Sequence, residues 1–213
     1  MELTMMYESK KLECLSTQKQ AITLHPEVIE ILFENRPYVK KVFSNLRGLH
    51  GITHMAMACI DPSDELMVFS STPTIEYNLI HQNLWVHDHA FFPEAELKNA
   101  LLWWDYSHDK LEKIKLKHHH LTVGMTICRP IGDFRLVYSF ATDEKYKNLR
   151  QYYTENLFGL IDMGDYFYKS LRERYNVYAT KHTPPNLSEF SSKASGLSIK
   201  PFLRVVQNTN KGK

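Results

Sequence analysis

The sequence contains few cysteines, and those it has are not arranged as a framework. Its 213 residues include Cys14, Cys59 and Cys128, with no CxxC spacing. We therefore expect three small hydrophobic side chains, buried or half exposed, rather than half-cystines or zinc ligands. Such sparse use of cysteine is typical of a reducing compartment, so we expect the protein in the cytoplasm.

Long apolar runs are missing as well. No window approaches the roughly 18 apolar residues that a membrane-spanning helix needs. The opening residues MELTMMYESKKLECL lack a basic stretch followed by an apolar run, so no secretory signal is predicted. Hydrophobic residues make up 43% and charged residues 23% of the chain, which predicts a folded soluble protein.

The sequence also lacks the motifs of common enzyme classes. It contains no GxGxxG and no glycine-rich loop between a strand and a helix, which argues against a dinucleotide site. It contains no GxSxG elbow, and no base flanks a cysteine, which argues against a nucleophilic hydrolase. We therefore expect a binding protein without a cofactor rather than an enzyme.

Histidine is abundant, with 11 residues that include His87, His89 and the run 118–120. Zinc or non-haem iron needs three ligands that converge in space. On a strand, His87 and His89 would share one face while Asp88 pointed to the other, so a third ligand would have to come from elsewhere. The run 118–120 closes a lysine-rich helix, where histidine favours the negative end of the helix dipole. We therefore predict no metal site, and a metal-binding enzyme using His87 and His89 is kept as the alternative.

Charge is distributed unevenly along the chain. From Lys181 onward six lysines and arginines face the single acid Glu189, whereas the preceding residues carry a slight acidic excess. This predicts an N-terminal segment over residues 1–22, a folded domain over 23–178 and a flexible basic tail over 179–213. Electrostatic contact between the tail and nucleic acid or an acidic partner is the alternative.

Hydrophobic periodicity predicts alternating helices and hairpins. Residues 24–46 have helical spacing that Pro37 divides, and a helix begins at Thr72 and Pro73. The predicted hairpins pair residues 51–61 with 66–71 and 121–130 with 134–142, and further helical patterns cover 92–104, 108–120 and a long stretch from Asp143. We expect an α/β protein, a three-layer α/β/α sandwich with a central antiparallel sheet, similar in outline to PAS and GAF sensor domains.

Aromatic side chains are concentrated in the middle of the chain, among them Trp85, Trp103 and Trp104. Many of them must simply fill a core. A sheet that faces helices across a layer of Trp and Tyr, with one or two polar groups, is nevertheless how proteins enclose an amphipathic small molecule. The sequence therefore favours a ligand pocket in this region.

About half of the chain, residues 42–150, resembles the autoinducer-binding domain of LuxR-type quorum-sensing transcription regulators. The resemblance rests on five stretches in the family's order and spacing: SSTPTIEYN (Ser70–Asn78), VHDHAF (Val86–Phe91), LLWWD (Leu101–Asp105), VGMTICRP (Val123–Pro130) and VYSFATD (Val137–Asp143). It implies a sensor that binds a small hydrophobic signal molecule and forms dimers.

The resemblance also implies a set of ligand-binding residues. In the family an Asp binds the amide N–H of an acyl-homoserine lactone, a Trp donates to the lactone carbonyl, and a Tyr and a Ser or Thr hold the acyl carbonyl. The positions that correspond are Asp88 or His89 for the Asp, Trp104 or Trp103 for the Trp, and Ser139 for the hydroxyl. We prefer Asp88 to His89.

Other positions depart from the family pattern. Thr72 stands in place of the Tyr, and Glu76 stands where a second Trp lines the pocket, with Tyr77 adjacent; Trp85 is expected among the aromatic side chains of the pocket. Each buried hydrogen-bonding group left unpaired costs about 1–3 kcal/mol, so two losses would weaken binding of an acyl-homoserine lactone by roughly two to three decades. We therefore expect a different hydrophobic signal as readily as an acyl-homoserine lactone.

The end of the chain differs most. LuxR-type regulators close with a helix-turn-helix domain of about 65 residues. Here 35 residues follow Tyr178, and Pro201 interrupts their apolar run. We therefore expect no independent DNA binding, and action through a homodimer or through a heterodimer with a full-length regulator. An interaction module that has lost its pocket is the other alternative.

Overall fold

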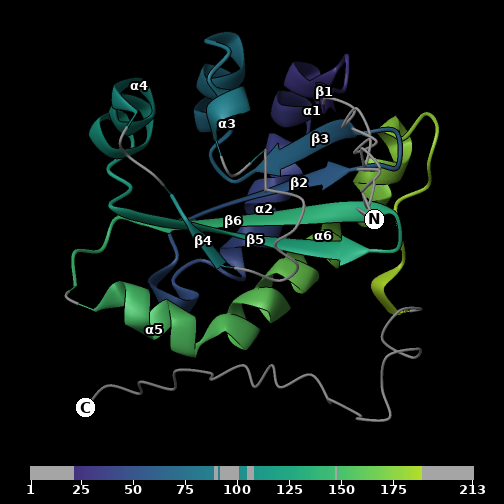
Figure 1. The fold of residues 1–213 in the computed structure, drawn as a ribbon. Coiled ribbons are helices and arrows are strands. Elements are labelled where there is room, and N and C mark those ends of the chain that lie inside the picture. The colour runs from purple at the N-terminus through teal and green to yellow at the C-terminus, as the bar shows by residue number, and fades with distance from the viewer. Residues whose placement is uncertain (1–21, 89–90, 92–100, 105–107, 147, 189–213) are drawn as a thin grey trace, which may run out of the picture.

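The computed structural model describes residues 22–88, 91, 101–104, 108–146 and 148–188. Helices and strands alternate along the chain, as shown in Figure 1. In chain order they are β1 (Thr23–Leu24), α1 (Val28–Glu34), α2 (Arg36–Ser44), η1 (Leu49–Gly51), β2 (His54–Ile60), β3 (Glu65–Ser70), α3 (Pro73–His81), η2 (Trp85–His87), β4 (Leu101–Trp103), α4 (Asp109–Glu112), η3 (Lys113–His118), β5 (Val123–Ile131), β6 (Phe134–Thr142), α5 (Leu149–Glu155) and α6 (Leu157–Tyr178).

One six-stranded sheet forms the centre of the protein. Its strand order is β1-β3-β2-β6-β5-β4. Both predicted hairpins are present, and they join through an antiparallel β2–β6 pair that places Ala56 opposite Ser139. Every pair is antiparallel except β1–β3. The central antiparallel sheet predicted from the period-two pattern is therefore confirmed, with a short parallel edge strand added.

The two faces of the sheet are covered by different helices, because side chains alternate along each strand. On β2, Met55 and Met57 belong to a core shared with α2 and α6. Ala58 belongs to a second core shared with α1, α3 and η3. Figure 1 shows α1, α3 and α4 along one side of the sheet and α5 and α6 along the other. The predicted three-layer sandwich is confirmed.

Buried polar contacts fasten α6 to its face of the sheet. The Tyr175 hydroxyl donates to the Met57 carbonyl oxygen over 2.9 Å. The Tyr138 hydroxyl donates to Asp165, which also forms an ion pair with Arg129 over 2.9 Å. Gly164 of α6 lies where an added Cβ would come 2.1 Å from the Tyr138 ring. The glycine permits this close approach.

Three local expectations were wrong. Residues 101–103 form β4, paired with β5, rather than the end of a helix; the rest of the helix predicted over 92–104, except Trp104, lies outside the described residues. The long helix from Asp143 is two helices, because the chain turns at Asn156 between α5 and α6. His87 lies on the single-turn helix η2 rather than on a strand, so the expected shared strand face for His87 and His89 does not apply.

The described chain continues past the end of α6. Residues 179–188 follow α6 and lie against it, with the Tyr168 hydroxyl donating to the Pro185 carbonyl oxygen and Leu187 buried. The flexibility of the remaining tail stays a prediction. Among the described residues, no helix is both long and apolar enough to cross a membrane.

Candidate functional site

Among the described residues, seven polar side chains are buried in the layer between the sheet and α1, α3 and η3. All are at most 4% exposed: His54, Ser70, Glu76, Asp88, Lys115, Thr126 and Ser139. Their surroundings are apolar and include Ala58, Ile75 and Val137. Burying a polar group is costly unless it is hydrogen-bonded, and burying a charge is costlier still. So many polar groups in one apolar layer mark this layer as the candidate site.

The first part of this group is an ion pair. The Lys115 ammonium lies 2.6 Å from Asp88 Oδ2, and both side chains are 3% exposed. The same ammonium lies 3.7 Å from the centroid of the Trp104 ring, within reach of a cation–π interaction. Lys115 belongs to η3, a π-helical turn, a feature that often occurs at functional sites.

The second part is a chain of hydroxyl groups beside Trp104. The indole Nε1–H of Trp104 donates to Thr126 Oγ1 over 3.2 Å, and Thr126 Oγ1 lies 3.3 Å from Ser139 Oγ. Thr126 and Ser139 are partners across β5 and β6. The Trp104 ring covers Gly124, where an added Cβ would lie 2.1 Å from the ring. Glycine at position 124 is therefore what lets the indole lie flat on the sheet.

The third part is the pair His54 and Glu76. His54 Nε2 lies 3.6 Å from Glu76 Oε1, which is too far for a good hydrogen bond. Among the described residues, neither ring nitrogen of His54 has a hydrogen-bond partner, and neither does Glu76 Oε2. Ser70 does form a hydrogen bond with the Glu76 carboxylate. The imidazole ring also lies edge-on to Trp104, with 6.1 Å between ring centroids.

Burial shifts the protonation of this pair. Desolvation, with help from the Lys115 ammonium and His119, lowers the pKa of His54 from 6.5 to about 3. Desolvation raises the pKa of Glu76 from 4.5 to about 7, against the opposing effects of Ser70 and Lys115. At neutral pH the imidazole is uncharged, and the carboxyl group keeps its proton to a higher pH than an ordinary glutamate because its pKa is raised.

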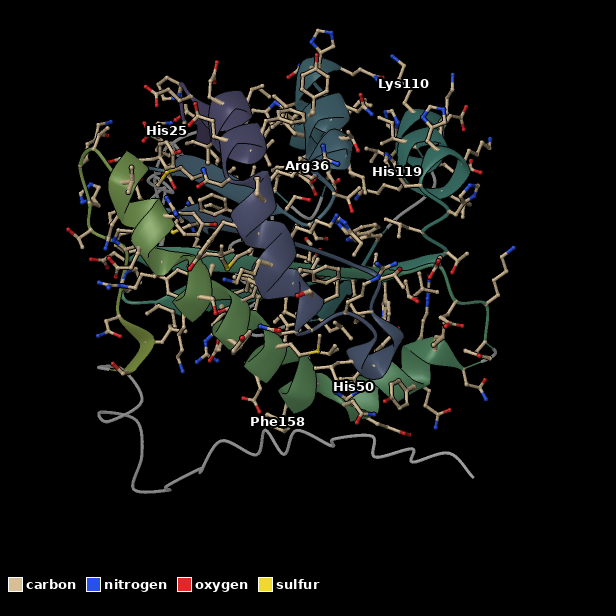
Figure 2. The ribbon with its side chains drawn as sticks, turned by 180° about the vertical axis from the view of Figure 1, so that it is seen from behind. His25, Arg36, His50, Lys110, His119 and Phe158 are labelled. Carbon is tan, nitrogen blue, oxygen red and sulfur yellow. The ribbon has the colours of Figure 1, made fainter. Side chains whose placement is uncertain are left out.

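A small cavity of about 150 Å³ reaches His54. Its lining is mostly polar and consists of Arg47, Thr53, His54, Thr72, Ile75, His119, Leu121 and Asp143. A larger cleft of about 490 Å³ lies elsewhere, beside His50 and Tyr152. Figure 2 shows the two regions apart, with His119 near η3 and His50 at the end of the α5–α6 layer. None of the predicted site residues that the structure describes lines the larger cleft.

The structure brings several of the predicted residues together. Asp88, Trp104 and Ser139 are linked through Lys115 and Thr126 into one buried set. Two others lie close to that set. Thr72 lines the small cavity, and Trp85 is buried in the same apolar layer, edge-on to Phe91 with 6.4 Å between centroids.

Two predicted residues lie elsewhere, and one lies outside the described residues. Trp103 points to the opposite face of the sheet, where its ring lies 6.5 Å from that of Tyr153. Tyr77 is half-buried on α3, stacked on His81 at 5.5 Å. His89 lies outside the described residues, so its place is not compared with that of Asp88.

Sequence reasoning missed His54, Lys115 and Thr126 as members of the group. The strand alternation through 54, 56 and 58 could have placed His54 on the Ala58 face. Thr126 could have been found as a polar residue inside an otherwise apolar strand. Lys115 had no comparable signal, because lysines in a lysine-rich helix are ordinarily exposed.

The metal alternative gains nothing from the described residues. No group of three His, Cys, Asp or Glu side chains among them could hold a metal ion. The His87 ring is stacked on His108, with 5.6 Å between centroids.

No protein-family model matches the chain, and no curated protein matches it by sequence. Solved structures do match. A crystal structure of Escherichia coli SdiA superposes with a TM-score of 0.51 and 13% identity, covering 67% of this chain and 64% of that one. SdiA in complex with octanoyl-rac-glycerol superposes with a TM-score of 0.50 and 13% identity, covering 72% and 66%. The chain thus spans slightly less than two thirds of SdiA.

SdiA is a LuxR-type autoinducer-binding regulator, so these matches bear on the fold expected from the five sequence stretches. At 13% identity a likeness of this kind establishes the fold alone. The described residues have the mixed α/β architecture of the SdiA ligand-binding domain, a largely antiparallel sheet with flanking helices.

Proposed function

We propose that this chain is a sensor domain that binds a small hydrophobic molecule between the sheet and the α1, α3 and η3 layer. One observation carries the proposal. Asp88, Trp104 and Ser139, which the family resemblance assigns to ligand binding, lie in one buried polar group surrounded by apolar side chains. A pocket with a few converging polar groups in an apolar wall is suited to an amphiphile, with a polar head and an apolar chain.

The fold supports the same conclusion. SdiA is known with octanoyl-rac-glycerol bound, which is an amphiphile of this kind. We propose that the present chain binds its ligand in the corresponding layer as a regulator, and that it is not an enzyme. The ligand is a hydrophobic acyl compound.

Ligand titration followed by thermal unfolding tests this function. Octanoyl-rac-glycerol and a series of acyl-homoserine lactones would be added to the purified protein. Ligand at 100 times its Kd stabilises a folded protein by about 2.7 kcal/mol, which corresponds to about 5–10 °C in a domain of this size. No shift with any member of the series, together with no hydrophobic compound in an extract of the purified protein, would contradict the proposal.

We further propose that the domain regulates transcription by dimerising, either with itself or with a full-length LuxR-type regulator. Co-purification with a full-length regulator, with and without ligand, tests this step. Recovery of the chain as a monomer in every case would contradict it.

One observation favours a second function, that of an interaction module with a closed pocket. Asp88 is already paired with Lys115, and the Trp104 indole already donates to Thr126. Groups satisfied within the protein need no ligand. The same titration separates the two functions, because a closed pocket gives no ligand-dependent stabilisation.

A further inference from the structure

The hydrogen-bonding capacity left over in the buried group is concentrated at one place. The ammonium of Lys115 is held by Asp88, and the indole of Trp104 is held by Thr126. In contrast, both nitrogens of His54 and one oxygen of Glu76 have no partner among the described residues. Such buried polar atoms each cost about 1–3 kcal/mol until something binds them. The atoms that await a ligand therefore belong to His54 and Glu76.

The small cavity opens onto His54, whose Nε2 lies 3.6 Å from Glu76 Oε1. His54 forms part of its wall, together with Thr53 and Thr72. Its volume of about 150 Å³ equals that of about five liquid water molecules, enough for a polar head group. Ile75 and Leu121 also line the cavity and belong to the apolar core between the sheet and α3. An apolar chain can extend from the head along these two side chains.

The charges around the cavity leave no net positive charge for an anion. Asp88 compensates the Lys115 ammonium at 2.6 Å. Arg47 and Asp143 on the rim bring one charge of each sign. Burial keeps His54 neutral, and Glu76 becomes anionic only near pH 7. A carboxylate head beside His54 would lie near the Glu76 carboxyl group, 3.6 Å from His54 Nε2, without a counter-ion of its own, a costly arrangement in a buried site.

We propose that His54 and Glu76 form the head-group subsite, and that it takes an uncharged head carrying an O–H or N–H donor beside an acceptor. The inference rests on the proposed function and deepens it by naming the ligand class and two specificity-determining residues. The imidazole gives one donor and one acceptor, and the carboxyl group receives the donor of the ligand. A fatty acid of equal chain length is excluded by its charge, and an amine is disfavoured because its ammonium head has donors but no acceptor for the imidazole N–H.

Three ligands with the same eight-carbon chain test the charge selectivity. Octanoyl-rac-glycerol is uncharged, octanoate is an anion and octylamine is a cation at pH 7. Calorimetric titration of the full chain is expected to show octanoyl-rac-glycerol binding at least tenfold more tightly than either charged ligand. Equal or tighter binding of octanoate or octylamine overturns the inference while the proposed function stands. Failure of all three and of the acyl-homoserine lactones overturns both.

Variants of the two residues test the subsite itself. His54→Phe and Glu76→Leu are each expected to weaken octanoyl-rac-glycerol at least tenfold, while Glu76→Gln, which keeps the hydrogen-bonding shape, stays within about threefold. The free His54→Phe protein is expected to melt no lower than wild type, because its ring leaves no nitrogen unpaired. Unchanged affinity in either His54→Phe or Glu76→Leu would overturn the assignment.

A matched control is offered by a second buried histidine. His25 is also 4% exposed, but its ring is fully engaged by the Tyr178 carbonyl oxygen and the Glu27 N–H. His25→Phe is expected to lower the melting temperature and to leave the affinity for octanoyl-rac-glycerol unchanged. His54→Phe is expected to do the opposite, keeping the melting temperature and losing affinity, and this difference separates a ligand contact from a purely structural histidine. Equal loss of affinity in both variants would overturn the assignment.

Discussion

His54 and Glu76 exchange their usual order of protonation when the chain folds. In the unfolded chain the imidazole titrates near 6.5 and the carboxyl group near 4.5; in the folded protein burial lowers the pKa of His54 to about 3 and raises the pKa of Glu76 to about 7. Between pH 4.5 and 6.5 the unfolded pair therefore holds its one proton on His54, and the folded pair holds it on Glu76. The folded and unfolded chains bind the same number of protons in this window. The pH dependences that the two groups give to the free energy of unfolding therefore cancel.

Replacing one residue of the pair is expected to reveal the pH dependence of stability that the other residue contributes. In Glu76→Gln only His54 remains; its folded pKa is lowered, so its stabilising contribution is complete above pH 6.5 and is lost as pH falls toward 3. In His54→Phe only Glu76 remains; its folded pKa is raised, so its contribution is complete below pH 4.5 and is lost as pH rises toward 7. Between pH 4.5 and 6.5 the slopes are opposite in sign, each up to about 1.4 kcal/mol per pH unit.

Urea unfolding at intervals from pH 4.5 to 7.5 measures these slopes. The other charged or titratable groups that face the pair are Lys115, Asp88 and His119, and all three are common to wild type and both variants. Differences from wild type therefore isolate the pair. If the curves of the three proteins ran parallel, His54 and Glu76 would keep their ordinary protonation in the fold.

The buried ion pair shows at the same scale why part of the site could not be predicted. Lys115 stands in the run KIKLK, whose lysines are expected to be exposed. The π-helical turn of η3 brings Lys115 inward, while Lys113 and Lys117 stay exposed. A local change in helix geometry of this kind leaves no trace in a 3.6-residue pattern.

At the scale of elements, the sequence predicts strands that pair with a near neighbour in the chain, but not a strand that pairs with a distant one. The two hairpins follow from alternation and turn residues within about twenty residues, and both are confirmed. The strand β4 depends on pairing with β5, more than twenty residues later, whereas its local sequence pattern predicts the end of a helix. Neighbouring strand residues point to opposite faces, so a shift of one position decides whether Trp103 or Trp104 reaches the site. The structure places Trp104 there, and the sequence alone left both open.

The contact between β4 and β5 at Gly124 gives a prediction for this element. In Gly124→Ala the new methyl group would lie 2.1 Å from the Trp104 ring and would force the indole off the sheet. Overpacking of this kind costs about 1–3 kcal/mol. It would also break the hydrogen bond from Trp104 to Thr126, so weaker binding of octanoyl-rac-glycerol is expected as well. Urea unfolding and tryptophan fluorescence measure the two effects.

Gly159→Ala is the matched control on α6. Its new methyl group would meet only the His50 imidazole, at 3.0 Å from Nε2, and that side chain can move. Because alanine favours a helix over glycine, this variant is expected to be neutral or up to about 1 kcal/mol more stable. Equal behaviour of the two variants would show that Trp104 does not depend on the space above Gly124.

At the scale of the whole molecule, contacts with the folded unit continue past the boundary that composition predicts. The sequence placed it at Tyr178, where α6 ends and the basic tail begins. Residues 179–188 nevertheless lie along α6: Arg172 donates to the carbonyl oxygens of Pro184 and Pro185, and the His182 ring lies 2.8 Å from the Ser63 hydroxyl. Composition could not reveal this, because these contacts depend on where α6 and the β2–β3 turn come together in space.

Truncation tests how much this segment contributes. A chain ending at Tyr178 loses the burial of Leu187, worth about 1.5–3 kcal/mol, and the hydrogen bond from Tyr168 to Pro185, worth about 1 kcal/mol. Ordering the segment has an entropic cost that offsets part of this gain. We therefore expect the chain ending at Tyr178 to be about 2 kcal/mol less stable to urea than a chain ending at Ser188.

Because the segment lies on the α6 side of the sheet, away from His54 and Glu76, both chains are expected to bind octanoyl-rac-glycerol equally well. Equal stability would place the boundary at Tyr178 after all, and loss of binding on truncation would show that the two faces of the sheet are coupled.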